Sequence, residues 1–283
     1  MAARKPALPR ARRRFGQHFL TDAGVIARIV ELIDPHPGDN LIEIGPGCGA
    51  LTRPVLTRSG RLCAIEIDRD LAERLRCDPE LQQRGAFTVI NADALRTDFA
   101  ALARGGPLRV FGNLPYNISS PLLFYLLTQE LHGGHIADLT FMLQKEVALR
   151  LCAHPGSRAY GRLTVMARFC AGCTPLLTVG PAAFAPRPQV TSEVVRIVPH
   201  AADAQRQALY PFLSRVTVTA FSARRKQAGN ALCGLFTADE LREAGVRAEL
   251  RPEQLTPEHY MALAGLLQRR EQGETWNLVS GSS

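Results

Sequence analysis

Apolar and polar positions along this chain follow two periods in turn, and these predict alternating helices and strands. Residues 25–33 carry apolar side chains at helical spacing, which predicts an amphipathic helix that ends before Pro35. Short apolar runs between helix-like segments are typical of buried parallel strands. The predicted strands cover residues 40–44, 62–68, 87–90, 108–112 and 138–143. The alternation therefore predicts an α/β fold with an open, mostly parallel sheet.

A different pattern begins near residue 201. A strand with alternating faces is predicted over residues 190–198, and only helical spacing follows it. We therefore expect an α/β domain over residues 15–200 and a small helical domain over residues 201–270. Residues 1–14 are expected to form a flexible basic arm and residues 271–283 a disordered tail.

The net charge of +8, from 34 Lys and Arg against 26 Asp and Glu, favours a polyanionic partner. Six of the first fourteen residues are basic, which indicates a solvated arm and leaves a mitochondrial presequence as a minority alternative. No apolar run is long enough to cross a membrane. Seven scattered cysteines are typical of a reducing compartment, so we expect a cytoplasmic protein. No metal site is expected, because Cys170 and Cys173 have no second pair at zinc-ligand spacing.

A glycine-rich turn, Gly45-Pro-Gly-Cys-Gly49, follows the first predicted strand and precedes a helix, as in the first unit of a nucleotide-binding sheet. Glu66 lies 21 positions after Gly45, near the offset at which an acid meets ribose hydroxyls, and Asp68 suits a helix N-cap. The spacing Gly-x-Gly-x-Gly differs from the pattern that admits a pyrophosphate. S-adenosylmethionine, a cofactor without phosphates, fits better, with its amino-acid tail close to Gly45 and Gly47.

The turn Asn113-Leu-Pro-Tyr116 follows the predicted strand at residues 108–112. Asn113 offers an amide oxygen, Leu114 a backbone carbonyl and Tyr116 an aromatic face, a set that suits an exocyclic amine on an aromatic ring. The alternative is an ordinary loop in which Asn caps a turn and Tyr packs on the core. Asp93, also at a strand end, either accepts from the cofactor's adenine amine or caps a helix.

Two further segments carry candidate contacts. Two prolines follow Phe184 and stiffen its loop, so the aromatic ring can be held in position. Arg224, Arg225 and Lys226 form a basic cluster in the predicted helical domain. Such a cluster is either solvated surface or, in a basic chain, a phosphate contact for RNA.

Together these motifs resemble the ribosomal RNA adenine dimethyltransferases. The resemblance is nearly continuous from Phe15 to Pro199, and residues 221–232 resemble the helical-domain motif of the small-subunit branch of that family. The matching segments are residues 15–20, 43–52, 64–68, 112–119, 142–147, 160–163 and 184–190.

The resemblance implies a class I (Rossmann-like) methyltransferase that moves methyl groups from S-adenosylmethionine to N6 of two neighbouring adenosines near the 3′ end of small-subunit rRNA. We also expect a partly assembled 30S subunit as substrate, because A-form RNA is recognised largely by shape and phosphates, and a monomeric enzyme. Tyr116 and Phe184 would lie against the target base. By position, the implied cofactor contacts are His18, Leu20, Gly45, Glu66, Asp93 and Asn113. His18 stands where the family often has Asn, and its ring can also donate to the cofactor's carboxylate end.

Three rival functions stay open on the sequence. Large-subunit rRNA methylases that confer antibiotic resistance share the Asn-x-Pro-Tyr turn, but the context of Arg224 favours the small-subunit branch. DNA adenine methylases use a related turn but carry a target-recognition domain that we do not find in this chain. An RNA-binding factor on a catalytically silent methylase fold is disfavoured because Gly45, Glu66, Asp93 and Asn113 are all present.

Overall fold

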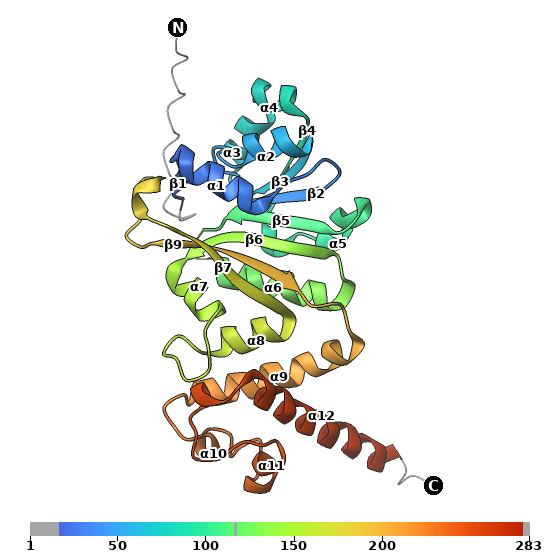
Figure 1. Cartoon of the computed structure of the whole chain (residues 1–283). Helices are drawn as coiled ribbons and strands as arrows, with labels where there is room; N and C mark the ends of the chain where they lie inside the picture. Colours follow the sequence, from blue (N-terminus) through green and yellow to red (C-terminus); the bar gives the residue numbers. More distant parts are fainter. Residues whose placement is uncertain (1–16, 116–117, 280–283) are drawn as a thin grey trace. The chain divides into compact units, whose positions relative to one another are not determined.

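A computed structural model describes residues 17–115 and 118–279 of the chain (Figure 1). The chain divides into two compact units. The first unit consists of the chain up to Ala148 together with Cys173–Pro199. The second consists of Leu149–Gly172 together with the chain from His200 onward. The expected arm at residues 1–14 lies outside the described residues.

A seven-stranded sheet forms the centre of the first unit, with the strand order β4-β3-β2-β5-β6-β9-β7. The pairs β2–β3, β2–β5, β3–β4 and β5–β6 are parallel, and β9 pairs with β6 in the antiparallel sense. The strands are β2 (Asn40–Ile44), β3 (Arg61–Glu66), β4 (Ala86–Asn91), β5 (Leu108–Asn113), β6 (Ile136–Gln144), β7 (Ala171–Val179) and β9 (Ser192–Pro199). The predicted mostly parallel α/β sheet is therefore confirmed.

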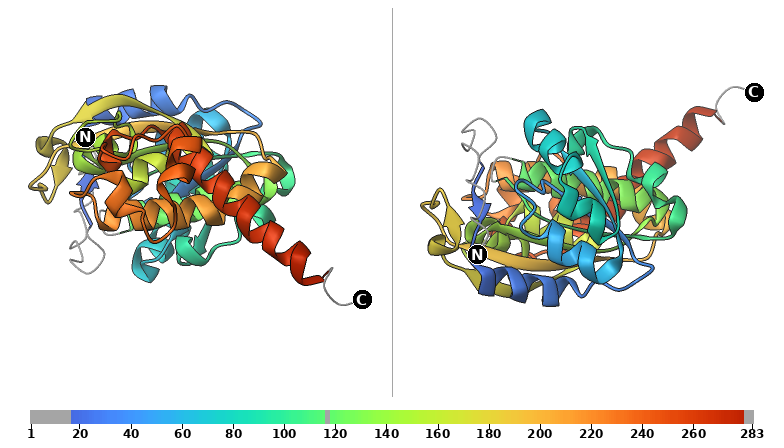
Figure 2. Two further views of the ribbon diagram at one scale, coloured as in Figure 1. Left: turned by 90° about the horizontal axis from the view of Figure 1, so that it is seen from below. Right: turned by 90° about the horizontal axis from the view of Figure 1, so that it is seen from above.

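Helices cover both sides of this sheet (Figure 2). Leu41 and Phe111 belong to a core cluster with residues of α1, α2 and α3, while their strand neighbours Ile42 and Val110, which point to the other face, are also buried. The helices of this part of the chain are α1 (Ala23–Ile33), α2 (Thr52–Ser59), α3 (Arg69–Arg76), α4 (Pro79–Arg84), α5 (Phe99–Leu102), α6 (Ser119–Gly133) and α7 (Lys145–Leu151). Short 3₁₀ helices occupy Ala94–Arg96, Ala103–Gly105 and Pro181–Ala183.

Local caps set where these helices begin and end. Asp22 accepts a hydrogen bond from the Val25 backbone N–H (2.9 Å) at the start of α1, and Asp34, with a φ of 52°, ends it. Asp68 accepts from the Asp70 backbone N–H (3.1 Å) and so is the N-cap of α3. The N-cap predicted for Asp68 is therefore confirmed. Because Asp68 follows β3, its cap fixes the start of α3 at the carboxyl edge of the sheet.

Two strand pairings were not predicted from the sequence. Strand β7 lies at the edge of the sheet, where Pro175 is tolerated because an edge strand need not donate every backbone N–H. A separate two-stranded sheet pairs β1 (Phe19–Leu20) with β8 (Phe184–Ala185) in the antiparallel sense. It joins segments far apart in sequence, with Phe19 opposite Ala185 and Leu20 opposite Phe184.

The second unit is helical. It contains α8 (Arg162–Cys170), α9 (Ala204–Ser222), α10 (Ala228–Ala231), α11 (Ala238–Glu243), α12 (Pro257–Val279) and a short 3₁₀ helix at Pro252–Gln254. Helix α8 belongs here, rather than before a boundary at residue 200, because it packs on α9: Thr217 Oγ1 donates to Met166 Sδ (3.5 Å) and the Arg162 guanidinium to Ser214 Oγ (3.2 Å).

The C-terminal segment also differs from the expectation. Helix α12 continues to Val279, whereas the sequence predicted a disordered tail from residue 271. Extending an existing helix adds one hydrogen bond per residue without a new nucleation cost, so a polar end can remain helical. None of the helices within residues 17–115 and 118–279 is long and apolar enough to cross a membrane.

Candidate functional site

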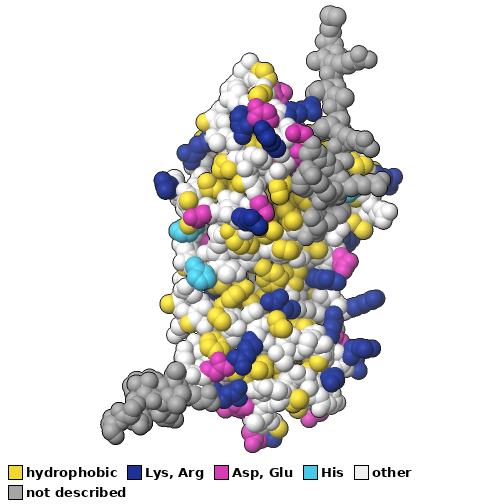
Figure 3. All heavy atoms as spheres, turned by 180° about the vertical axis from the view of Figure 1, so that it is seen from behind, with side chains coloured by type: hydrophobic (Ala, Val, Ile, Leu, Met, Phe, Trp, Pro, Cys, Tyr) yellow, Lys and Arg dark blue, Asp and Glu magenta, His cyan; other side chains and the backbone are white. Residues whose placement is uncertain are grey.

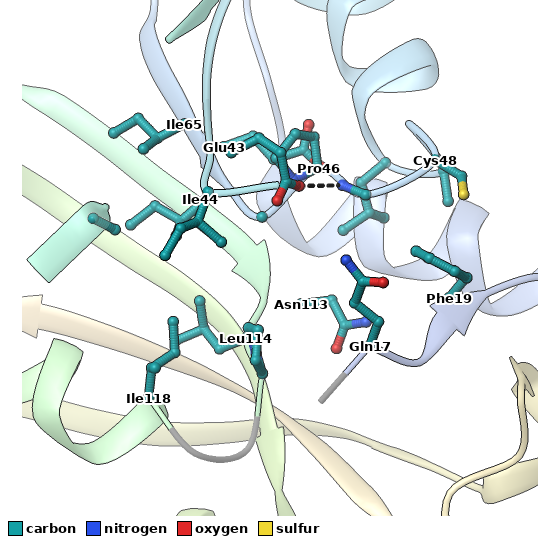
Figure 4. A pocket seen from close by; sticks show the side chains of 18 of the residues that line it. Gln17, Phe19, Glu43, Ile44, Pro46, Cys48, Ile65, Asn113, Leu114 and Ile118 are labelled. Carbon is teal, nitrogen blue, oxygen red and sulfur yellow. Dashed lines mark hydrogen bonds between the residues drawn. The ribbon is translucent and has the colours of Figure 1, made fainter. Parts of the chain in front are cut away.

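One pocket in the first unit gathers the sequence-predicted residues. Figure 4 shows it, with Gln17 and Phe19 on one side and Leu114 and Ile118 on the other. It lies at the carboxyl ends of β2, β3, β4 and β5, where open α/β sheets bind ligands. The predicted residues that line it are His18, Leu20, Gly45, Gly47, Glu66, Asp93, Asn113 and Leu114.

The glycine turn after β2 forms one wall of the pocket. Gly45 and Gly47 have φ values of 67° and 57°, a conformation that favours glycine. A Cβ at Gly47 would lie 3.2 Å from the Phe19 ring, so the absence of a side chain lets the turn pack against β1. At these two positions the turn therefore presents backbone rather than side chains to a bound molecule, while Pro46 and Cys48 add their side chains to the lining.

Glu66 ends β3 beside this turn and is 4% exposed. Its Oε2 accepts from the Gly47 backbone N–H (3.1 Å), and its Oε1 accepts from the Asp68 backbone N–H (3.0 Å). Burial raises the pKa of this carboxyl, and the backbone N–H donors from Asp68 and Gly47 oppose the rise. Each carboxylate oxygen has a second lone pair, so Glu66 can also accept from two neighbouring hydroxyls.

The sequence left two roles open for Asp93, a helix cap and an acceptor for the cofactor's adenine amine, and in the structure it caps a helix. Its Oδ1 accepts from the Leu95 backbone N–H (2.9 Å) at the start of the 3₁₀ helix Ala94–Arg96. The same residue lines the pocket. Capping and ligand binding are therefore compatible, because a carboxylate has two oxygens.

Asn113 ends β5 with its amide oriented by the main chain. Its Nδ2 donates to the His18 carbonyl oxygen (3.0 Å), and because a carbonyl only accepts, the amide oxygen must be on the other branch. The next residue, Leu114, is 1% exposed and donates its backbone N–H to the Met142 carbonyl (3.1 Å). Tyr116, the predicted stacking ring, lies outside the described residues.

Strands β1 and β8 hold the His18 side of the pocket. The His18 ring donates from Nδ1 to the Pro186 carbonyl oxygen (2.8 Å), which fixes the hydrogen on that nitrogen. Phe184 does not line the pocket: it is 5% exposed and packs in the same hydrophobic cluster as Leu20. The contact of the Phe184 ring with the target base stays a prediction.

Glu43 is a pocket residue to which the sequence gave no role. It is 2% exposed, and its Oε2 accepts from the Thr52 hydroxyl (2.6 Å). Burial is the main reason that the pKa of Glu43 is raised from 4.5 to about 8. The sequence did contain a signal for this residue, because Glu43 is an acid in a mostly apolar strand that ends directly before the glycine turn.

The predicted RNA-binding triplet lies in the second unit and divides into two kinds of residue. Arg224 donates from Nε to Glu253 (2.6 Å) and from its terminal nitrogen to the Arg158 carbonyl (2.7 Å). Arg225 and Lys226 are exposed. Within the described ranges, no group of three or more His, Cys, Asp or Glu residues is placed to hold a metal ion.

The sheet order, the glycine turn after β2, the acid ending β3 and the Asn-Leu-Pro turn after β5 define a class I methyltransferase. A dimethyladenosine transferase from Plasmodium falciparum matches with a TM-score of 0.75 at 24% identity, covering 90% of this chain and 98% of that one. The 23S rRNA methyltransferase ErmE matches with a TM-score of 0.68 at 27% identity, covering 88% and 99%.

Sequence comparison reaches a narrower group. The family model for ribosomal RNA adenine dimethylases matches residues 9–269. Ribosomal RNA small subunit methyltransferase A of Aeromonas hydrophila is 48% identical over 264 residues, 93% of this chain and 96% of the relative. The protein of that name from Pectobacterium atrosepticum is 51% identical over 259 residues, 91% and 93% of the two chains. The chain belongs to the ribosomal RNA adenine dimethylase family, as its sequence motifs predicted.

Proposed function

We propose that this protein transfers methyl groups from S-adenosylmethionine to N6 of two adjacent adenosines near the 3′ end of small-subunit (16S) rRNA, giving N6,N6-dimethyladenosines. Membership of the adenine dimethylase family and the small-subunit names of its relatives support this. The observation that carries it in the structure is the Asn113–Leu114 turn, which lines the same pocket as Glu66 and Asp93.

The residues present fit S-adenosylmethionine. The side-chain-free turn at Gly45 and Gly47 leaves its backbone open to the amino-acid tail, and Glu66 offers lone pairs to the ribose hydroxyls. Asp93 keeps one carboxylate oxygen for the adenine amine while the other caps its helix. When bound there, the cofactor's sulfonium supplies the methyl group.

The Asn-Leu-Pro turn prepares the adenosine amine. The N6 lone pair is delocalised into the purine ring and is a poor nucleophile in that state. If the Asn113 amide oxygen and the Leu114 carbonyl each accept one N6 hydrogen, the amine is held in the pyramidal form whose lone pair can attack. These two oxygens also oppose the positive charge that develops on nitrogen, and preorganised groups of this kind favour the transition state over the ground state. No dedicated base is required, because a methylated, positively charged N6 loses its proton readily.

RNA is held largely through phosphates in this proposal. Arg225 and Lys226 are exposed and suited to phosphate contact, whereas Arg224 is engaged within its own unit. In the lower half of Figure 3, Lys and Arg side chains gather along the right-hand edge of the face that is drawn. A-form RNA is recognised mainly by shape and backbone, so we propose a structured, partly assembled 30S subunit as substrate. We also propose that the enzyme acts as a monomer.

The test is primer extension across the two adenosines in cells that lack this gene. Unmodified adenosines let the polymerase read through, and a copy of the wild-type gene should restore the stops while Asn113→Ala should not. Purified protein should then methylate undermethylated small subunits but not large subunits. Stops that persist without the gene, or methylation of large subunits alone, would contradict the proposed substrate.

A further inference from the structure

Arg53 contacts the glycine turn without lining the pocket. It is the second residue of α2, and its NH1 donates to the Cys48 carbonyl (2.7 Å) and to the Gly49 carbonyl (2.9 Å). Cys48 lines the pocket, and so does Ala50, the residue after Gly49. One guanidinium nitrogen therefore joins two consecutive carbonyls of the segment that the cofactor is expected to contact.

Fixing these carbonyls also fixes the donors of the turn. A trans peptide is planar, so the direction of the Cys48 carbonyl sets the direction of the Gly49 N–H, which donates to the Pro46 carbonyl (2.9 Å). In the same way, the Gly49 carbonyl sets the direction of the Ala50 N–H at the pocket. The turn is thus held by its own backbone bond, by the Arg53 backbone N–H, which donates to the Gly49 carbonyl (3.3 Å), and by the Arg53 guanidinium, which alone reaches the Cys48 carbonyl as well.

Gly49 makes room for this contact. Its φ of 78° favours glycine, and a Cβ there would lie 2.6 Å from NH1 of Arg53. The third glycine of the motif therefore serves the guanidinium, whereas Gly47 serves the packing of Phe19.

The other edge of the guanidinium is anchored to α4. Its NH2 donates to Asp78 Oδ2 (2.5 Å) and its Nε to Glu80 Oε2 (3.3 Å), while Asp78 Oδ1 caps α4 by accepting from the Glu80 N–H (2.9 Å). The Arg53 side chain is 28% exposed and that of Asp78 is 19% exposed. A planar fork with partners on both edges has a defined orientation, which a lysine ammonium at this position would not have.

We propose that Arg53 is a positioning residue for the cofactor site: it sets the backbone of the glycine turn through two carbonyls and transmits the position of α4 to the pocket. Taking S-adenosylmethionine as the ligand rests on the proposed function above. Arg53 touches neither cofactor nor adenosine in this role, so it should affect cofactor affinity and leave the transfer step itself nearly unchanged.

The experiment compares Arg53→Met with Arg84→Met. Arg84 bonds to Glu80 and to Thr57 Oγ1 (2.6 Å) at the same α2–α4 contact but does not reach the turn, so it is a matched control. Calorimetry with S-adenosylhomocysteine should show that Arg53→Met binds at least about tenfold more weakly than wild type. This is the effect of losing one or two hydrogen bonds from a charged donor. Arg84→Met should stay within about twofold of wild type.

Two readouts separate positioning from general loosening. The KM for S-adenosylmethionine should rise in Arg53→Met while kcat at saturating cofactor on small subunits stays within about twofold. Methylguanidinium at millimolar concentration should restore the affinity of Arg53→Ala for S-adenosylhomocysteine and should leave that of Arg84→Ala unchanged.

Three outcomes would overturn the inference. Wild-type affinity in Arg53→Met would do so, as would an equal loss in Arg84→Met, because α2–α4 packing alone would then explain the effect. A wild-type protein that does not bind the probe would contradict the proposed function, and this inference with it.

Discussion

Asn113 allows a direct test of how the amine is prepared, because the His18 carbonyl already fixes the orientation of its amide. Asn113→Ala should lower the single-turnover rate of methyl transfer by about 10² to 10³, the effect of removing one preorganised transition-state partner. RNA affinity should hardly change. The measurement uses undermethylated small subunits at saturating cofactor.

Asn40→Ala is the control for that variant. Asn40 begins β2, and its amide donates to the Leu102 carbonyl (3.2 Å) and the Gly106 carbonyl (3.0 Å), away from the pocket. It should lose stability but keep its transfer rate. Normal turnover by Asn113→Ala would show that the amide does not act on N6.

The buried carboxyl of Glu43 predicts a pH-dependent stability. Its folded-state pKa of about 8 lies above the ordinary value of 4.5, so the folded protein holds this proton more tightly than the unfolded chain does. The resulting stabilisation is complete below pH 4.5 and is lost as the pH rises towards 8. Glu43→Gln, which can keep the Thr52 hydrogen bond, should remove this dependence.

Urea unfolding of both proteins checks the sign. Near pH 5 the two free energies of unfolding should be similar, and near pH 8 the Gln variant should be more stable by about 2 to 4 kcal/mol. Comparing the two proteins cancels the slope contributed by an independent raised carboxyl such as Glu130. Parallel curves across this range would mean that Glu43 stays ionised in the fold.

Sequence patterns located the pocket residues because most of them follow a strand in a parallel sheet, and such positions must meet at one edge. They could not locate residues whose role depends on a distant partner. Glu43 has a raised pKa mainly because of its burial, and the Arg53 guanidinium is oriented by Asp78, which lies 25 positions away. Phe184 pairs through β8 with Leu20 and its ring is buried, a long-range contact that no local pattern reports.

The pairing of β5 with β2 predicts a strict requirement for glycine at position 112. A Cβ there would lie 2.2 Å from the Ile44 carbonyl oxygen, so the two strands would have to separate. Gly112→Ala should destabilise the protein by about 1 to 3 kcal/mol and displace the adjoining Asn113. Gly180→Ala, where no atom lies within 4 Å of an added Cβ, should stay within about 0.5 kcal/mol of wild type.

Urea unfolding measures both glycine variants, and a transfer assay at saturating cofactor measures the displacement. Equal stability of the two variants would mean that β5 can move without cost.

The helix and strand periods predicted the alternating elements well. They did not predict β7, because an edge strand containing Pro175 lacks a clear apolar run. The pairing of β1 with β8 was not predicted either, because no local sequence pattern indicates a partner so far away in the sequence.

We expect Arg225 and Lys226 to contribute to RNA binding by the second unit and Arg224 to contribute to its stability. Arg225→Ala together with Lys226→Ala should weaken RNA binding and lower the salt slope by about 2, one for each phosphate that is no longer neutralised, with the melting temperature unchanged. Arg224→Ala should instead cost about 1 kcal/mol of stability, because it breaks the pair with Glu253 and the bond to the Arg158 carbonyl. Filter binding across a salt series and thermal unfolding measure the two effects. An unchanged salt slope in the double variant would make this cluster ordinary surface.

The bond from the His18 ring to the Pro186 carbonyl has a consequence for how the protein is made. It joins residues 168 apart, so the His18 side of the pocket cannot be completed until most of the chain has left the ribosome. A nascent chain that ends with α8 already carries the glycine turn, Glu66, Asp93 and Asn113 but lacks β8. The carbonyl that orients the Asn113 amide therefore reaches its place late in synthesis, and a partly made chain would hold this amide without that constraint.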